Sequence, residues 1–135
     1  MPRSTAILIV EDEYGLAELL RDLLTECGYD VSLAINGRLA LDVLREKEIH
    51  VVVTDVMMPI MDGPELARAM REDERHRQIP IVLMTSRRSA MPPAAGLYDA
   101  VLIKPFTPAA LMKVLQEYRR DGDPPTEDCD AAGLA

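Results

Sequence analysis

Short runs of apolar residues, none of which alternates with polar residues, constrain the fold of this chain more than any other feature. They are three to five residues long and rich in β-branched side chains. A continuous apolar run this short is typical of a strand that is buried on both faces. The runs are Ala6–Val10, Val51–Val53, Ile81–Met84 and Ala100–Ile103, with a weaker candidate strand at Val31–Ala34.

Helical patterns occupy the intervals between these runs. Apolar residues recur at helical spacing in three segments, and Gly28 follows the first, where a left-handed residue would end a helix. Strands that alternate with helices predict an α/β fold, a doubly wound five-stranded parallel sheet with right-handed crossovers and helices on both faces. The apolar positions are Leu16, Leu20, Leu23, Leu24 and Cys27, then Ala40, Val43 and Leu44, and later Leu111, Val114, Leu115 and Tyr118.

Length and charge narrow the class of protein. The 135 residues suit one domain, which we place at residues 1–120, and the net charge of −8 argues against a nucleic-acid partner. Residues 121–135 carry five acids and few large apolar side chains, so we expect an acidic flexible tail. With no leader and no apolar run of membrane-spanning length, we expect a cytoplasmic protein without a membrane partner. Cys27 falls on an apolar helix face and is expected to be a buried free thiol.

Residues that carry chemistry directly follow four of the predicted strands. Glu11 and Asp12 come after the first strand, and Asp55 comes after the third. Thr85 follows the fourth strand and Lys104 follows the fifth. Ligands of doubly wound sheets bind beyond the carboxyl ends of the strands. We therefore expect these side chains to converge on one rim of the sheet.

Three carboxylates brought to one place repel one another unless a cation lies between them. Mg²⁺ prefers oxygen ligands, and it binds through one or two carboxylates together with phosphate oxygens. A carboxylate beside Mg²⁺ can act as a nucleophile and form an aspartyl phosphate. Lys104 can supply positive charge to the transferring phosphoryl group, and the Thr85 hydroxyl can donate a hydrogen bond to it. The residues therefore fit Mg²⁺-dependent phosphoryl transfer to a carboxylate.

Four sequence strings carry a resemblance to a known family and together cover roughly residues 5–120. The string around Asp55 is specific even by itself. On these strings, the chain resembles the response-regulator receiver domains of two-component signalling, which have the CheY-like variant of the flavodoxin-like fold. The strings are Ile9-Val10-Glu11-Asp12-Glu13, Thr54-Asp55-Val56-Met57-Met58-Pro59-Ile60-Met61-Asp62-Gly63, Met84-Thr85-Ser86 and Lys104-Pro105-Phe106-Thr107.

The resemblance implies a role for each matching residue at the metal site. Asp55 resembles the phosphoacceptor, and Glu11 and Asp12 resemble the acidic pair that holds Mg²⁺ directly or through water. Asp55 is itself a metal ligand in this arrangement, and Met57 is expected to offer its backbone carbonyl to the metal.

The resemblance also implies roles for residues that surround the metal site. Thr85 resembles the switch hydroxyl and Lys104 the phosphate-sensing lysine. Pro59 and Gly63 are expected to shape the loop after the third strand, and Pro105 is expected to follow a cis peptide bond.

Plainer structural roles stay open for several of these residues. Glu11 and Asp12 are alternatively solvated loop acids, Thr85 a helix cap and Lys104 a surface lysine. Asp62 suits the N-cap of a helix from Pro64 onward better than it suits a metal ligand. The histidines His50 and His76 are expected to be structural or solvated. The basic cluster Arg71, Arg75, His76 and Arg77 is expected to be a solvated helix end.

Two features depart from the pattern of the family. Val101 stands where most receivers have an aromatic residue, whose ring moves together with the switch hydroxyl. This chain has no ring at that position to couple to Thr85, and Tyr98 is nearby at a different spacing. The interval from Thr85 to Lys104 is 19 positions, which is shorter than expected, and residues 86–98 contain a proline pair. We expect a short or irregular fourth helix, which phosphorylation would order.

The combined interpretation is a stand-alone receiver that accepts a phosphoryl group on Asp55 from a histidine kinase or a histidine phosphotransfer protein. It would assist its own phosphorylation and dephosphorylation without being a conventional enzyme, and would then favour a downstream protein target. We expect a monomer, with phosphorylation-dependent dimerisation as an open alternative. Two other interpretations remain: an interaction module that is never phosphorylated, and a receiver excised from a hybrid kinase or a larger regulator. A phosphatase of the haloacid-dehalogenase type is disfavoured because Met57 stands where its second acid would be.

Overall fold

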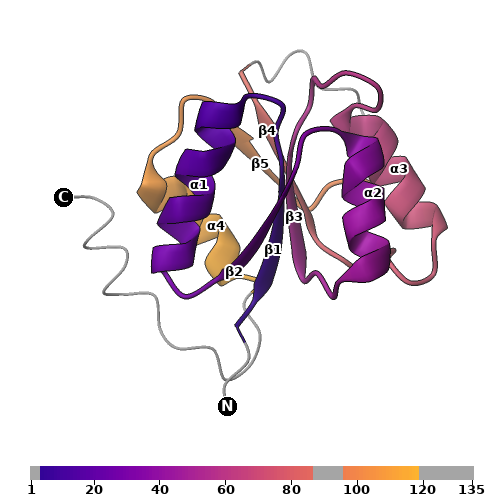
Figure 1. Ribbon diagram of the computed structural model, residues 1–135, viewed down its shortest axis with the longest axis horizontal. Coiled ribbons are helices and arrows are strands. Elements are labelled where there is room, and N and C mark those ends of the chain that lie inside the picture. The colour runs from indigo at the N-terminus through magenta and orange to yellow at the C-terminus, as the bar shows by residue number, and fades with distance from the viewer. Residues whose placement is uncertain (1–3, 87–95, 119–135) are drawn as a thin grey trace.

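Residues 4–86 and 96–118 are described by the computed structural model, which has a central parallel sheet between two layers of helices (Figure 1). The strands are β1 (Ala6–Val10), β2 (Asp30–Ala34), β3 (Val51–Asp55), β4 (Ile81–Thr85) and β5 (Ala100–Ile103). All neighbouring pairs are parallel, in the order β2-β1-β3-β4-β5. Strand order therefore reverses at β1, and the carboxyl ends of β1 and β3 lie next to each other at that point.

The described helices cover both faces of the sheet. Figure 1 shows α1 (Tyr14–Glu26) and α4 (Pro108–Gln116) on one side, and α2 (Gly37–Glu46) and α3 (Gly63–Glu72) on the other. Gly28 follows α1 with a φ of 90°, in the left-handed region that glycine adopts without steric cost. Asp62 caps α3 in a reciprocal capping box with Glu65, and proline occupies the first turn. The sequence predictions for Gly28 and Asp62 are both confirmed.

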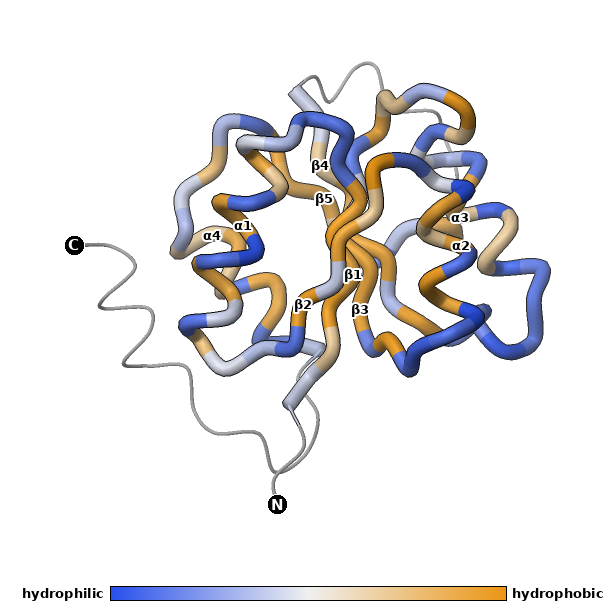
Figure 2. Tube along the Cα trace, in the orientation of Figure 1, coloured by the Kyte–Doolittle hydropathy of each residue, from blue (hydrophilic) through white to orange (hydrophobic). Residues whose placement is uncertain are grey.

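Two hydrophobic clusters, one on each face of the sheet, form the core. Alternate residues of β1 divide between the clusters, because successive side chains of a strand point to opposite faces. Leu8 packs with Leu44 and Leu66 toward α2 and α3, whereas Ile9 packs with residues of α1 and α4. Figure 2 shows hydrophobic residues along almost the whole of the central strands. This burial on both faces explains why the strands read as continuous apolar runs.

The structure corrects two sequence predictions, one for Cys27 and one for the basic cluster that begins at Arg71. Cys27 is disulfide-bonded and half-buried, so the prediction of a buried free thiol is wrong. The predicted solvated helix end holds for Arg75 and Arg77, which are exposed, but is wrong for Arg71, whose side chain is 19% exposed and donates to several carbonyl groups. His76 is also buried, with Nε2 3.2 Å from the Leu44 carbonyl oxygen.

Two further predictions fall largely on residues that are not described. The acidic tail at 121–135 lies outside the described residues, as do residues 87–95 of the expected irregular fourth helix. Ser86 and residues 96–98, which flank that gap, lie in neither a helix nor a strand. Within residues 4–86 and 96–118, no helix combines the length and the apolar character that crossing a membrane requires.

Candidate functional site

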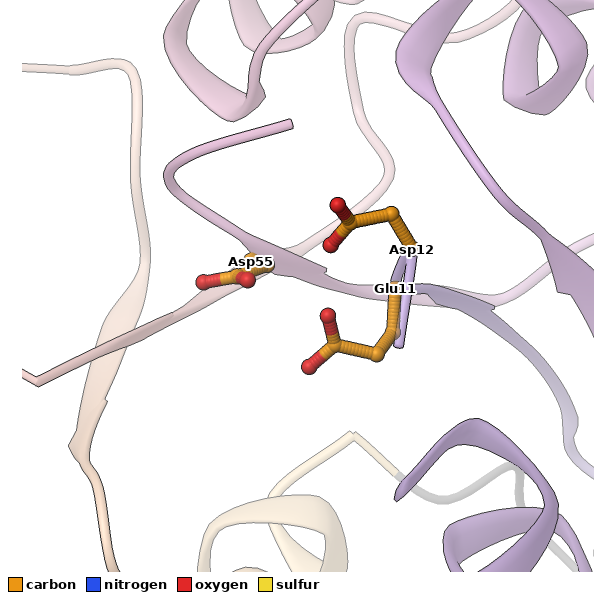
Figure 3. A group of neighbouring side chains, drawn as sticks. All are labelled: Glu11, Asp12 and Asp55. Atoms are coloured by element: carbon orange, nitrogen blue, oxygen red, sulfur yellow. The ribbon is translucent and has the colours of Figure 1, made fainter. Parts of the chain in front are cut away.

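Three carboxylates meet where the strand order reverses. Glu11 and Asp12 directly follow β1, and Asp55 is the last residue of β3, which pairs with β1. One carboxylate oxygen from each of the three residues lies within 4.8 Å of the others (Figure 3). The expected convergence of this acidic set on the rim of the sheet is therefore confirmed.

The three carboxylates differ in their exposure to water. Glu11 is 1% exposed, Asp55 is half-buried and Asp12 is exposed. A buried carboxylate is costly unless it is paired, and three such groups together repel one another. A divalent cation with oxygen ligands fits this donor set, because each residue can offer one oxygen at a common point. The acidic cluster thus resembles a receiver Mg²⁺ site.

Lys104 joins the acidic cluster from the far edge of the sheet. Its Nζ donates a hydrogen bond to Glu11 Oε1 at 2.8 Å and lies 3.4 Å from Asp55 Oδ2. Partial burial alone would lower the pKa of Lys104, but the hydrogen bond to Glu11 and the charges of Asp55 and Glu11 outweigh it. The net shift in the pKa of Lys104 is upward. Lys104 therefore carries a full positive charge at neutral pH, and the plainer interpretation as a surface lysine does not hold.

Thr85 and Met57 both follow the three acidic residues in the chain. Thr85 is the last residue of β4 and is 5% exposed. Its carbonyl accepts a hydrogen bond from the Lys104 backbone N–H at 2.7 Å, which ties the ends of β4 and β5 together. Met57 lies two residues after Asp55, and its side chain is 76% exposed.

A hydrogen bond restricts the rotation of the Asp55 carboxylate. Its Oδ1 accepts this bond from the Val56 N–H at 2.9 Å.

The loop between β3 and α3, residues 56–62, is held at its base and near its tip. At the base, the Gly63 N–H donates to the Val56 carbonyl at 2.9 Å. At the tip, the Met61 N–H donates to the Pro59 carbonyl at 2.7 Å, around Ile60 with its φ of 71°. The Met61 carbonyl then accepts a hydrogen bond from the N–H of Gly37, the first residue of α2.

Sequence reasoning missed the contact between Gly37 and Met61. The apolar pattern concerns side chains, whereas this contact joins two backbone groups from segments 24 positions apart. The pair Asn36-Gly37 before a helical pattern was an available signal, because asparagine is a strong N-cap. The side chain of Asn36 indeed accepts a hydrogen bond from the Leu39 N–H at 2.9 Å.

The two histidines have structural contacts away from the acidic cluster. His50 precedes β3, and its Nδ1 accepts a hydrogen bond from the Ala6 N–H at 2.7 Å, at the amino end of the sheet. His76 packs against the end of α2 through the Leu44 carbonyl. The peptide bond between Lys104 and Pro105 is cis, as the family resemblance implies.

Comparison with protein families decides the class of the chain. The family model described as "Response regulator receiver domain" matches residues 7–116. The chain belongs to the response regulator receiver family. Receiver domains of this family interact with histidine kinases. The matched span contains the acidic cluster, Thr85 and Lys104.

Curated relatives support the family assignment over most of the chain. The chain is 35% identical over 121 residues to "Probable transcriptional regulator ycf27" of Cyanidium caldarium, covering 87% of this chain and 47% of that protein. It is 34% identical over 125 residues to "DNA-binding response regulator MtrA" of Mycobacterium tuberculosis, covering 90% of this chain and 54% of that protein. The chain thus spans about half the length of the curated relatives that it matches.

Solved structures show the same fold. The chemotaxis response regulator CheY4 of Vibrio cholerae superposes with a TM-score of 0.80 at 29% identity, covering 86% of this chain and 99% of that chain. The receiver domain of the sensor histidine kinase PA1611 from Pseudomonas aeruginosa PAO1 superposes with a TM-score of 0.76 at 26% identity, covering 86% and 98%. That structure has a magnesium ion coordinated in its active site cleft.

Proposed function

We propose that this receiver accepts a phosphoryl group on Asp55, in a Mg²⁺-dependent reaction, from a phosphohistidine of a histidine kinase or a histidine phosphotransfer protein. The observation that carries the proposal is the group of three carboxylates within 4.8 Å, with Lys104 in contact with two of them. Structural ion pairs alone do not require three acids at one point, because their mutual repulsion costs stability. A site that binds a cation and a phosphoryl group makes use of that arrangement.

In the proposed reaction, a carboxylate oxygen of Asp55 attacks the phosphorus of the phosphohistidine in line with the scissile bond. A phosphorus–oxygen bond forms and the phosphorus–nitrogen bond breaks, and the electron pair of the broken bond stays on the imidazole nitrogen. The hydrogen bond from the Val56 N–H to Asp55 Oδ1 orients the carboxylate for this attack. Attack by water on the same phosphorus later releases inorganic phosphate and restores the Asp55 carboxylate.

The other polar residues at the rim stabilise the charge on the phosphoryl oxygens. Lys104 Nζ, which lies 3.4 Å from Asp55 Oδ2, is proposed to contact one phosphoryl oxygen, and the Thr85 hydroxyl is proposed to donate a hydrogen bond to another. Glu11, Asp12, Asp55 and the Met57 carbonyl are the proposed Mg²⁺ ligands. When bound, Mg²⁺ would neutralise the carboxylates and draw charge from the phosphoryl oxygens.

We further propose a stand-alone receiver at residues 1–120 with an acidic tail at 121–135, which acts in the cytoplasm as a monomer and signals by changing its affinity for a downstream protein. An output through nucleic acid is not proposed, because the net charge is −8.

Intact mass spectrometry tests the proposal. The protein is incubated with acetyl phosphate with and without Mg²⁺, beside an Asp55→Asn variant. We expect a single phosphoryl adduct in the wild type that requires Mg²⁺ and is absent from the variant. A folded wild-type protein that takes up no phosphoryl group, and whose fold does not respond to beryllofluoride, would instead identify an interaction module that is never phosphorylated.

A further inference from the structure

The first turn of α2 touches the loop that follows Asp55 more closely than any side chain at that position would allow. Gly37 is buried, and its N–H donates a hydrogen bond to the Met61 carbonyl at 2.9 Å. A Cβ atom at residue 37 would lie 2.6 Å from Met61 Cγ and 2.9 Å from the Met61 carbonyl oxygen. Both distances are shorter than Cβ atoms show in real structures. Residue 37 is therefore required to be glycine because a side chain would clash with Met61, and not because its backbone adopts an unusual conformation.

The loop of residues 56–62 is closely packed at both ends, against Gly37 at Met61 and against Asp55 at Gly63. A Cβ atom at Gly63 would lie 2.4 Å from the Asp55 carbonyl oxygen, so the backbones of Gly63 and Asp55 pack closely there. Val56, which is buried, and Met57, whose carbonyl is a proposed metal ligand, lie between Asp55 and Met61. Met61 itself packs against the core cluster beneath α2 and α3. We therefore expect a displacement of Met61 to be transmitted to residues 57–60.

We infer that Gly37 is a positioning residue for the metal and phosphoryl site: its contact with Met61 fixes the loop of residues 56–62 and hence the Met57 carbonyl relative to Asp55. The inference rests on the proposed function and adds a residue that lies outside the acidic cluster. Supporting contacts of this kind usually change metal affinity by about 10-fold to 100-fold when they are lost, because they orient the ligands. We expect Gly37→Ala to weaken Mg²⁺ binding by about 10-fold or more for the same reason.

The chain offers a matched control for the same chemical change. Gly15 lies in the first turn of α1, and a Cβ atom there would meet no atom within 4 Å. Gly15→Ala and Gly37→Ala both replace a helical glycine by alanine, so both gain the same intrinsic helix propensity. Only Gly37→Ala forces Met61 to move. The double variant Gly37→Ala/Met61→Ala removes the nearer clash, with Cγ, but keeps the clash with the carbonyl oxygen.

The test measures the melting temperature of each variant across a range of Mg²⁺ concentrations. A ligand that binds only the folded state stabilises it by an amount set by the ratio of concentration to Kd, so the Mg²⁺ dependence reports affinity separately from intrinsic stability. We expect wild type and Gly15→Ala to respond at the same Mg²⁺ concentrations. Gly37→Ala should respond at concentrations about 10-fold higher, with the double variant between it and the wild type.

The outcomes separate positioning from a merely structural role. A Gly37→Ala variant with a lower melting temperature but an unchanged Mg²⁺ dependence would overturn the inference and leave the proposed function intact. If Gly37→Ala does not fold, the double variant carries the same comparison, and its Mg²⁺ response at wild-type concentrations would overturn the inference. A wild-type protein without any Mg²⁺ response or phosphoryl adduct would overturn both the inference and the proposed function.

Discussion

Arg71 allows a stability effect to be worked out from named contacts. Its guanidinium donates to the carbonyls of Arg77 (2.9 Å), Ile79 (2.8 Å) and Leu97 (3.0 Å) and to Asp99 Oδ2 (2.8 Å). These bonds join the end of α3 to the start of β4 and to the turn that leads into β5. Arg71→Met keeps most of the aliphatic stem but removes all four donors.

The expected loss is smaller than the sum of four bonds. A hydrogen bond to a charged group contributes about 1.5–3 kcal/mol, but such values are not additive, and carbonyls near the surface regain water. Asp99 is 41% exposed, so its ion pair is screened, and it keeps the hydrogen bond from the Ile81 N–H. We therefore expect Arg71→Met to lower the free energy of unfolding by about 2–3 kcal/mol.

Equilibrium unfolding in urea, followed by circular dichroism, measures this loss. The midpoint should fall while the slope m stays unchanged, because the same surface is exposed on unfolding. Arg75→Met is the control: Arg75 also bonds to a carboxylate, that of Asp73, but its side chain is 63% exposed. We expect the control to lower stability by less than Arg71→Met does, because its exposed ion pair is screened by solvent. Equal effects of the two variants would refute the argument from burial.

Three other predictions concern the loop tip, an exposed carboxylate and the site lysine. Ile60 is 76% exposed with a φ of 71°, so Ile60→Asn should relieve left-handed strain and raise the free energy of unfolding by about 1 kcal/mol in a urea titration. Hydrogen bonds from Arg75 lower the pKa of Asp73 to about 2, so its pairing stabilises the fold above the unfolded pKa and is lost as the pH falls from about 4 toward 2. An NMR titration should show a pKa of about 2 for Asp73 in the wild type and a smaller lowering in Arg75→Met, which keeps the backbone hydrogen bond from residue 75 to Asp73. Lys104→Met should slow adduct formation from acetyl phosphate by about 100-fold, because it removes a charge from the transition state. The same variant should bind Mg²⁺ more tightly in a calorimetric titration, because Lys104 no longer competes for Glu11.

The sheet was predictable because its strands are buried on both faces. The apolar run of Ala6–Val10 matches β1 residue for residue, and Ala100–Ile103 matches β5. β3 extends beyond its apolar run to Asp55, because Thr54 and Asp55 pair with Leu83 and Met84 of β4. Pairing with a neighbouring strand leaves no trace in the apolar pattern of a single segment.

The site was predictable as a set of residues but not as a set of contacts. Topology alone brings Glu11, Asp12 and Asp55 to one rim, because the carboxyl ends of adjacent parallel strands meet there. The hydrogen bond between Lys104 and Glu11 joins residues 93 positions apart and depends on side-chain conformations. The same applies to Arg71, whose partners are backbone carbonyls that no sequence pattern distinguishes.

Identification of the phosphorylated residue tests the central claim most directly. The wild-type protein is treated with acetyl phosphate and Mg²⁺ and then reduced with borohydride, which converts an acyl phosphate into an alcohol and so turns an aspartyl phosphate into homoserine. Peptide mass spectrometry then locates the homoserine. We predict homoserine at Asp55 and at no other acid, and none without Mg²⁺. Homoserine at Asp12 in place of Asp55, or at no residue of a folded protein, would contradict the account.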